Sequence, residues 1–251
     1  MTANKTPNSS IHIPYQVDES ENRNHFYENH WKRVALDILS KHEPSLKELT
    51  LLDYGCGRGE TLDYANQYGM IPTGMDVDPE CVRIAAKRGA AEVLDLGNAT
   101  RQVGEKSFDV VTCFHVLEHV DNPKEVLSML ARAARKYLVT AVPNLRLLNN
   151  LRKPRTESVR DNEGHLQSWD HAHFRNLAQN HCGLKIIEWG FDATILPVAS
   201  ELTKRIFGTK AAIKLETGLF KRCFPYNGIS VIALMTPLKV SHDLNKCQIA
   251  F

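Results

Sequence analysis

The sequence predicts an α/β fold in which a mostly parallel sheet is covered by helices on both faces. Short apolar segments alternate along the chain with segments of helical periodicity, a pattern typical of right-handed β-α-β crossovers. The 251 residues are enough to bury a full core, and 43% hydrophobic and 24% charged residues are ordinary for one soluble domain. We therefore expect a single domain with added loops and tails.

The first half of the chain is predicted to form four strands with helices between them. Residues 1–24 are polar and aperiodic, which predicts a flexible leader. In the helix that follows, Tyr27, Trp31, Val34 and Ile38 share one apolar face. Apolar runs predict strands around Leu51-Leu52 and at 71–75, 91–94 and 108–114, and capping residues predict helices at 60–67 and from Asp78-Pro79 to Gly89.

The second half is predicted to add three strands. Asp121-Asn122-Pro123 starts a helix, and its inward face is expected to hold Val126, Leu127, Leu130 and Ala134. Further strands are expected at 137–142, 184–189 and 229–235, with a helix between Asp170 and Gly183. The prediction is one domain at 25–237 and a tail at 238–251. Within that domain, a loop at 144–164 and an insertion at 193–228 are interpreted as a substrate cap or a homodimer surface.

A glycine-rich turn follows the first predicted strand and opens a helix. Its sequence is Asp53-Tyr54-Gly55-Cys56-Gly57-Arg58-Gly59-Glu60. Alternate glycines permit a tight turn and let backbone amides approach a ligand closely. The free amides and partial positive charge of a helix N-terminus favour a carboxylate or phosphate there. The turn is therefore a candidate for one half of a nucleotide-like site.

Asp76 ends the second predicted strand and supplies the other half of that site. It lies 76−55 = 21 residues after the first glycine, and an ionised carboxylate can accept both hydrogen bonds of a ribose diol. A nicotinamide dinucleotide would use a similar pair, but its fingerprint requires a glycine where this chain has Glu60. The third glycine is one residue early, at Gly59, which argues for S-adenosylmethionine instead.

The pattern Asp53-x-Gly55-x-Gly57-x-Gly59, then Asp76, then Ser-Phe-Asp-Val-Val-Thr-Cys-Phe-His-Val-Leu-Glu-His-Val at 107–120, resembles the class I S-adenosylmethionine-dependent methyltransferases. The likeness covers about residues 31–237. It implies a Rossmann-like sheet of seven strands, the last antiparallel, with S-adenosylmethionine as cofactor. The cofactor-binding residues it implies are Asp53, Tyr54, Gly55, Cys56, Gly57, Gly59, Asp76, Val77, Asp95, Leu96 and Phe114.

Within that set, the resemblance assigns separate parts of the cofactor to three residues. Asp95 would accept the adenine amine, Leu96 would lie against the ring, and Phe114 would lie near the methionine half, where an aromatic face can attract a sulfonium. Asp95 also precedes Gly97-Asn98, so turn formation is an alternative explanation for this acid.

Three histidines are candidates for catalysis. A hydroxyl acceptor benefits from a base of near-neutral pKa, and His115 and His119 follow the fourth predicted strand, with Glu118 between them. This stretch most closely resembles the ubiquinone-biosynthesis O-methyltransferases, where two glutamates and a histidine can hold a divalent metal. Because His115 replaces the first glutamate, we expect no metal here. His115, Glu118 and His119 could still form a mixed ligand set, or could serve packing alone.

His165 is the third candidate. The segment from Gly164 to Asp170 is similar to one in family members where a histidine precedes the helix before the sixth strand, so His165 could line the substrate cavity. A histidine that fixes the loop by hydrogen bonds is an equal alternative. His171 and His173 are expected to be exposed residues of a first helical turn.

Composition limits the partners that we expect. A net charge of +2 does not imply a nucleic-acid or membrane surface, so any basic partner site must be local. No stretch is long enough to span a bilayer, and the six cysteines form no Cys-x-x-Cys pair, so we expect reduced thiols and the cytoplasm. The expected acceptor is a small molecule methylated on oxygen. The alternatives are an RNA 2′-O-methyltransferase and a non-catalytic cofactor-binding accessory protein of the same fold.

Overall fold

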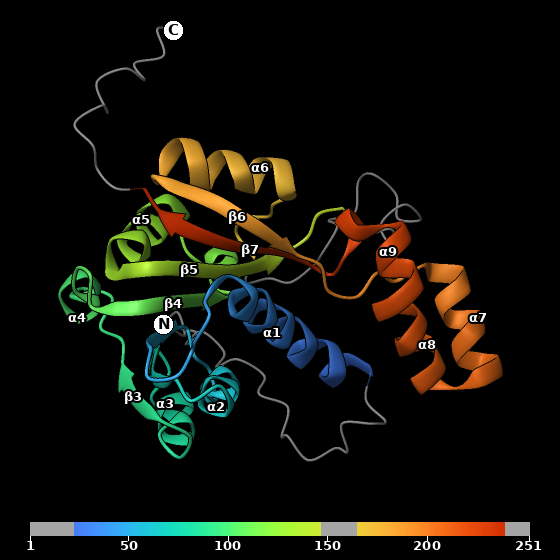
Figure 1. The fold of residues 1–251 in the computed structure, drawn as a ribbon, viewed down its shortest axis with the longest axis horizontal. Helices are drawn as coiled ribbons and strands as arrows, with labels where there is room; N and C mark the ends of the chain where they lie inside the picture. Colours follow the sequence, from blue (N-terminus) through green and yellow to red (C-terminus); the bar gives the residue numbers. More distant parts are fainter. Residues whose placement is uncertain (1–22, 147–164, 239–251) are drawn as a thin grey trace, which may run out of the picture.

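The structure, a computed structural model, describes residues 23–146 and 165–238 (Figure 1). Its seven strands form one sheet in the order β3-β2-β1-β4-β5-β7-β6, in which β7 is antiparallel to both neighbours. The strands are β1 Thr50–Tyr54, β2 Ile71–Asp76, β3 Ala90–Val93, β4 Phe108–Phe114, β5 Ala134–Pro143, β6 Leu184–Gly190 and β7 Ser230–Pro237. This arrangement confirms the predicted α/β fold with an antiparallel last strand.

Helices cover both faces of this sheet (Figure 1). They are α1 Arg23–His42, α2 Glu60–Gln67, α3 Pro79–Ala85, α4 Ala99–Val103, α5 Pro123–Ala133 and α6 His171–Arg175, which continues as a π-helix at Asn176–His181. Successive strand residues point to opposite faces, so Leu51 packs into the core beneath α1, whereas Leu52 packs into the core beneath α5. Both leucines are fully buried.

Local sequence signals placed most of these elements correctly. The bounds of α2 and β4 match the predictions, and the Asp78 side chain accepts a hydrogen bond from the Glu80 amide at 2.8 Å, as expected of an N-cap. Ala134, however, was predicted on a helix and instead begins β5, where it pairs with Phe108. α3 ends at Ala85, before the predicted stop at Gly89, and α4 was not predicted.

The insertion between β6 and β7 is helical. It contains α7 Pro197–Phe207, α8 Thr209–Leu215, a π-helix at Glu216–Phe220 and α9 Lys221–Cys223, and it projects beyond the end of the sheet (Figure 1). The Thr194 amide donates to the Glu216 carbonyl at 3.1 Å, and the Tyr27 hydroxyl on α1 donates to the buried Glu216 carboxylate. Glu216 therefore joins the helices of the insertion to the segment that follows β6 and to the first helix.

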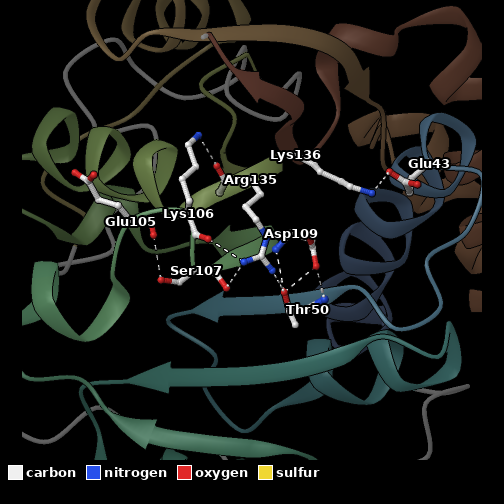
Figure 2. A network of polar contacts seen from close by, with 9 residues as sticks. Glu43, Thr50, Glu105, Lys106, Ser107, Asp109, Arg135 and Lys136 are labelled. Carbon is white, nitrogen blue, oxygen red and sulfur yellow. Dashed lines mark hydrogen bonds and ion pairs between the residues drawn. The ribbon is translucent and has the colours of Figure 1, made fainter. Parts of the chain in front are cut away.

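The edge of the sheet where β1 and β4 begin is closed by a polar network (Figure 2). Asp109 accepts hydrogen bonds from the Thr50 amide at 3.0 Å and from the Arg135 Nε at 2.9 Å. Arg135 also donates to the carbonyls of Lys106 and Ser107 at 2.8 and 3.0 Å. We call Thr50, Lys106, Ser107, Asp109 and Arg135 the Asp109 clasp.

Several expectations concern residues outside 23–146 and 165–238. These are residues 1–22 of the leader, most of the loop at 144–164, nearly all of the tail and Cys247. The predicted end of the leader was wrong, because Arg23 and Asn24 already belong to α1. Within the described part, Cys56, Cys81, Cys113 and Cys182 are buried free thiols and Cys223 is an exposed one. Every helix in that part is too short or too polar to cross a bilayer.

Candidate functional site

The candidate site lies where the parallel strands end, at the edge opposite the Asp109 clasp. In the predicted turn after β1, Gly55, Gly57 and Gly59 have φ values of 78°, 52° and 87°. Residues that carry a side chain rarely adopt such positive φ values. A side chain on Gly55 would collide with Val116, whereas a Cβ on Gly57 would point into open space. Packing therefore requires Gly55 to lack a side chain, and Gly57 leaves free space above the turn.

Asp76 joins this turn to β2. Its Oδ2 accepts a hydrogen bond from the Gly57 amide at 2.8 Å, and its Oδ1 accepts one from the Asp78 amide at 3.0 Å. Each carboxylate oxygen has a further lone pair, so both can still accept a hydroxyl proton. The carboxylate is partly exposed beside the open space at Gly57, a position that suits a ribose diol.

Three of the predicted cofactor residues have buried side chains. Asp53, Tyr54 and Cys56 are 1%, 3% and 4% exposed. Asp53 accepts a hydrogen bond from the Thr112 hydroxyl at 2.7 Å, and burial raises its pKa to about 6. These contacts connect β1 to β4 and support the turn from below. Direct cofactor contact by these three side chains stays a prediction.

The residues predicted for the adenine half lie on the surface beside β2 and β3. Asp95 accepts hydrogen bonds from the Gly97 amide and the Asn98 side chain, both at 2.9 Å. These bonds stabilise a turn, which was the alternative explanation for this acid. Leu96 and Val77 are 70% and 54% exposed. Two apolar side chains that face solvent at this edge are available to pack against a planar ring.

Phe114 ends β4 and His115 follows it, and both rings contact Trp31 of α1. The Trp31 ring meets Phe114 edge-on at 5.1 Å between centroids and lies 4.6 Å from the His115 ring. Phe114 is 6% exposed, and its contact with the methionine half stays a prediction. The sequence placed Trp31 on the apolar face of its helix and gave no sign of this contact with His115.

Both ring nitrogens of His115 lie close to polar side chains. Its Nε2 lies 3.2 Å from the Ser230 hydroxyl of β7, and its Nδ1 lies 3.2 Å from the Glu118 carboxylate. Its φ of 54° is unusual for a residue with a side chain, and its amide donates to the Ala141 carbonyl at 2.8 Å. This strained position at the sheet edge directs the imidazole between two elements that are distant in sequence.

Glu118, His119 and His165 form a second group beside it. Glu118 lies in a single 3₁₀ turn, Leu117–His119, and is fully buried, and among the described residues neither carboxylate oxygen receives a hydrogen bond. The His119 Nε2 lies 4.0 Å from the Glu118 carboxylate, and the His119 ring meets that of His165 at 4.8 Å. The imidazole of His119 is 43% exposed.

These three residues could hold a metal ion. One ligand atom from each lies within 4.8 Å of the others, and two imidazoles with a carboxylate suit first-row divalent ions. The set differs from the predicted one because His165 takes the place of His115. The Leu166 amide donates to the Glu118 carbonyl at 2.7 Å, which holds His165 beside the 3₁₀ turn.

Sequence reasoning missed Asp192 and Ser230. Asp192 is buried, its Oδ2 accepts a hydrogen bond from the Ser230 amide at 3.0 Å, and burial raises its pKa to about 7. Its Oδ1 has no hydrogen-bond partner among the described residues. Asp192 thus supports Ser230, which contacts His115. No motif surrounds either residue, so the sequence offered no signal for them.

The two histidines predicted to be exposed, His171 and His173, differ in the structure. His173 is exposed, as predicted, and its Nδ1 lies 2.9 Å from the Asp170 carboxylate. The prediction for His171 was wrong, because its ring is only 7% exposed and contacts Trp189, Phe191 and Tyr226. The end of β6 and the return from the insertion cover the start of α6, and this burial lowers the pKa of His171 to about 4.

Comparisons with known proteins agree with the fold and the turn. Residues 22–188 match the family model described as a methyltransferase domain. The ubiquinone biosynthesis O-methyltransferase of Erwinia tasmaniensis is 29% identical over 105 residues, 39% of this chain and 43% of the relative. That of Xanthomonas oryzae pv. oryzae is 32% identical over 105 residues, 39% of this chain and 44% of the relative. The chain thus spans less than half the length of these curated relatives.

Solved structures share the whole fold at low identity. The magnesium protoporphyrin IX methyltransferase of Synechocystis PCC 6803 with bound SAH has a TM-score of 0.60 and 16% identity, covering 88% of this chain and 90% of that one. The [4+2]-cyclase SpnF has a TM-score of 0.56 and 15% identity, covering 92% and 88%. These likenesses establish the fold, and the second shows that one fold hosts proteins of different reactions.

Proposed function

The chain belongs to the methyltransferase domain family, whose cofactor is S-adenosylmethionine, and from this premise we propose that it transfers a methyl group to an oxygen atom of a small molecule. The observation that supports the proposal most strongly is the junction of the glycine turn with Asp76. There the Gly57 amide donates to a carboxylate that borders open space. We assign the ribose to Asp76 and the adenine to the surface formed by Leu96 and Val77.

The bound cofactor supplies a methyl group on a positively charged sulfur, which is already activated for transfer. The protein therefore has to orient the acceptor oxygen in line with the methyl group and to exclude water. We assign the acceptor side to the end of β4, where His115, His119 and His165 gather. Fixed groups at the end of a central strand can hold an acceptor in one orientation.

We assign the base to His119. Both nitrogens of His115 face partners within the protein, whereas the His119 ring is 43% exposed and has the buried Glu118 carboxylate behind its Nε2. In this assignment the acceptor hydroxyl gives its proton to a His119 nitrogen as its oxygen bonds to the methyl carbon. Glu118 then stabilises the imidazolium that forms. His115 is a positioning residue for Glu118.

Oxygen as the acceptor atom rests on two lines of support. A hydroxyl needs a base of near-neutral pKa, and three histidines lie at this edge. The curated relatives of the matched segment are named as O-methyltransferases.

A second candidate function is 2′-O-methylation of RNA, for which we expect a metal-dependent reaction, and Glu118, His119 and His165 have ligand atoms within 4.8 Å of one another. In that case an ion held by these residues would supply charge stabilisation to the acceptor oxygen. The two functions differ in their dependence on metal. Chelator would abolish transfer in the second and leave it unchanged in the first.

Calorimetric titration with S-adenosylhomocysteine, compared with NAD and repeated with chelator, tests the cofactor site. Asp76→Ala should lower the affinity for S-adenosylhomocysteine by about 1.5 to 3 kcal/mol, since it removes charge-assisted hydrogen bonds to the ribose. Asp63→Ala, on the exposed side of α2, is the matched control and should bind as wild type. Unchanged affinity in Asp76→Ala would rule out the ribose assignment.

The reaction itself is tested with cofactor labelled in the methyl group and a screen of small hydroxylated acceptors and RNA. Label transferred to a small hydroxyl compound would support the main proposal. Tight binding of S-adenosylhomocysteine with no transfer to any acceptor would instead support a non-catalytic accessory protein.

A further inference from the structure

Ser230 begins β7 at the point where the insertion returns to the sheet. It is 2% exposed, its amide donates to the buried Asp192 carboxylate at 3.0 Å, and it pairs with Pro143 of β5. These contacts with Asp192 and Pro143 use the backbone of Ser230 and leave out its hydroxyl group. The backbone therefore holds Ser230 in place, and the hydroxyl group is available for a separate role.

The Ser230 hydroxyl belongs to a chain of polar side chains that ends at the proposed base. It lies 3.2 Å from the Nε2 of His115, and the Nδ1 of the same ring lies 3.2 Å from the Oε1 of Glu118. The same carboxylate oxygen lies 4.0 Å from the Nε2 of His119. The chain thus joins β7, the end of β4 and the 3₁₀ turn that carries the proposed base. We call these four residues the Ser230 chain.

The orientation of the His115 ring is the variable link in the Ser230 chain. Rotation of an imidazole by about 180° around its Cβ–Cγ bond exchanges Nδ1 with a carbon atom, and such side chains have two broad orientations of this kind. The Trp31 ring, 4.6 Å away between centroids, can pack against either orientation. Within 23–146 and 165–238, Ser230 and Glu118 are the polar partners of the two ring nitrogens, so they distinguish one orientation from the other.

The Glu118 carboxylate depends on this ring orientation. It is fully buried, and neither of its oxygens receives a hydrogen bond from the part of the chain that the structure describes. A buried carboxylate is costly unless polar hydrogens face it, and the His115 Nδ1 lies closer to it than the His119 Nε2 does. A His115 ring turned the other way would present a carbon atom to Glu118, and the carboxylate could then turn away from His119.

From this geometry we propose that Ser230 is a positioning residue for methyl transfer. Its hydroxyl group selects the orientation of His115 in which Nδ1 faces Glu118, and Glu118 then stays aligned behind His119. This role rests on the proposed function, since it assigns Ser230 a part in base catalysis by His119. It also connects the insertion to catalysis, because Ser230 is the residue at which the insertion rejoins the sheet.

The variant Ser230→Ala tests this role. It removes the hydroxyl group and keeps the backbone contacts with Asp192 and Pro143, so the variant should fold. Its kcat for methyl transfer should fall roughly tenfold, because one orienting hydrogen bond is lost. The KM for the cofactor and the affinity for S-adenosylhomocysteine should stay as in wild type, since Asp76 and the glycine turn are unchanged. A normal kcat in Ser230→Ala would overturn the proposal.

Thr236→Val is the matched control on the same strand. The Thr236 hydroxyl donates to the Lys136 carbonyl at 3.0 Å, near the other end of β7, so this change removes a β7 hydroxyl that belongs to no contact with the histidines. Its kcat should equal that of wild type. If Thr236→Val lowers kcat as much as Ser230→Ala does, the effect belongs to the strand in general and the proposal fails.

A double-mutant cycle with His115→Asn determines whether Ser230 acts through His115. Asparagine tolerates the positive φ of this position better than most residues do. The loss of kcat in Ser230→Ala/His115→Asn should be no greater than in His115→Asn alone, because the contact between the two side chains is already absent. Losses that multiply would mean that Ser230 acts independently of His115, which would overturn the proposal.

Nitrogen-15 NMR of the histidine rings gives a readout that needs no acceptor. The His115 signals are identified by their absence in His115→Asn. They should move in Ser230→Ala and stay in place in Thr236→Val, and unchanged signals in Ser230→Ala would overturn the proposal. A failure of the proposed function looks different. Wild type would then transfer no methyl group although the His115 signals move, and the part of Ser230 in transfer would fail with it.

Discussion

The two edges of the sheet treat carboxylates differently. At the edge where β1 and β4 begin, Asp109 accepts hydrogen bonds from two residues and is neutralised by Arg135 (Figure 2). At the opposite edge, Glu118 and Asp192 are almost completely buried, and each has at least one oxygen without a hydrogen-bond partner among the described residues. Orphaned buried oxygens are costly, so folds rarely retain them without a use.

This difference shows how the fold separates stability from function. The Asp109 clasp joins the β4–β5 pair to β1 with charge-assisted hydrogen bonds, which are about twice as strong as neutral ones. The other edge leaves polar groups available for a ligand. A substitution in the clasp should therefore lower stability alone, whereas one at the site should lower binding or turnover.

The largest expected effect is on turnover. His119→Ala should lower the rate of methyl transfer by about 10² to 10⁴, because a positioned base contributes this much. Affinity for S-adenosylhomocysteine and thermal stability should be retained. His173→Ala, on the exposed start of α6, is the control and should be fully active. A loss of stability with normal turnover would show that His119 is a packing residue.

The next largest effect is on the stability of the fold, which should depend on pH through the ionisation of Asp192. Burial raises the pKa of this carboxyl from 3.8 to about 7, so its contribution to stability is complete below about pH 4 and is lost as the pH rises through about 7. Asp192→Asn keeps an acceptor for the Ser230 amide and cannot ionise. We expect it to be more stable than wild type above pH 7, by up to about 4 kcal/mol.

Urea unfolding at a series of pH values measures this difference. The advantage of Asp192→Asn over wild type should shrink as the pH falls below about 7. A constant difference at every pH would contradict a buried carboxyl that titrates in this range. The clasp is the natural contrast, because the Arg135 guanidinium holds the pKa of Asp109 below its usual range, so that contribution is lost at acid pH.

A smaller loss is expected from breaking the clasp. Asp109→Ala removes the acceptor of Arg135 and of the Thr50 amide and should lower the free energy of unfolding by about 2 to 3 kcal/mol. Glu105→Ala is the control, since its carboxylate pairs with Arg132 at 3.6 Å on the surface and should contribute less than about 1 kcal/mol. Affinity for S-adenosylhomocysteine should be unchanged in both. A weakened affinity in Asp109→Ala would mean that the two edges are coupled.

The fold was predictable because its signals are local. Strand β4 at Phe108–Phe114 and helix α2 at Glu60–Gln67 follow from apolar runs, caps and glycine stops within a few residues. The start of β5 was not predictable in this way. Ala134 suits a helix as well as a strand, and its pairing with Phe108 across the sheet decides between them.

The candidate site was predictable only in part, for the same reason. The glycine turn and Asp76 have a fixed spacing along the chain, so the sequence located them. The contact of His115 with Ser230 joins residues 115 positions apart and leaves no pattern in the sequence. His171 was misjudged because Tyr226, which returns from the insertion, helps to bury it. Long-range packing therefore decides which histidines are exposed.

The smallest predicted effect on stability comes from alanine substitutions at two glycines, one at the proposed cofactor site and one elsewhere in the fold. Gly57 and Gly183 both have positive φ, at 52° and 64°, and at both a Cβ would meet no atom within 4 Å. Alanine at either position should cost roughly 1 kcal/mol of stability, because only the backbone conformation is penalised. Only Gly57→Ala should also weaken binding of S-adenosylhomocysteine, since its methyl group would occupy the space assigned to the ligand. Calorimetry on the two variants decides the matter, and equal affinities would mean that the open space above Gly57 is not the cofactor site.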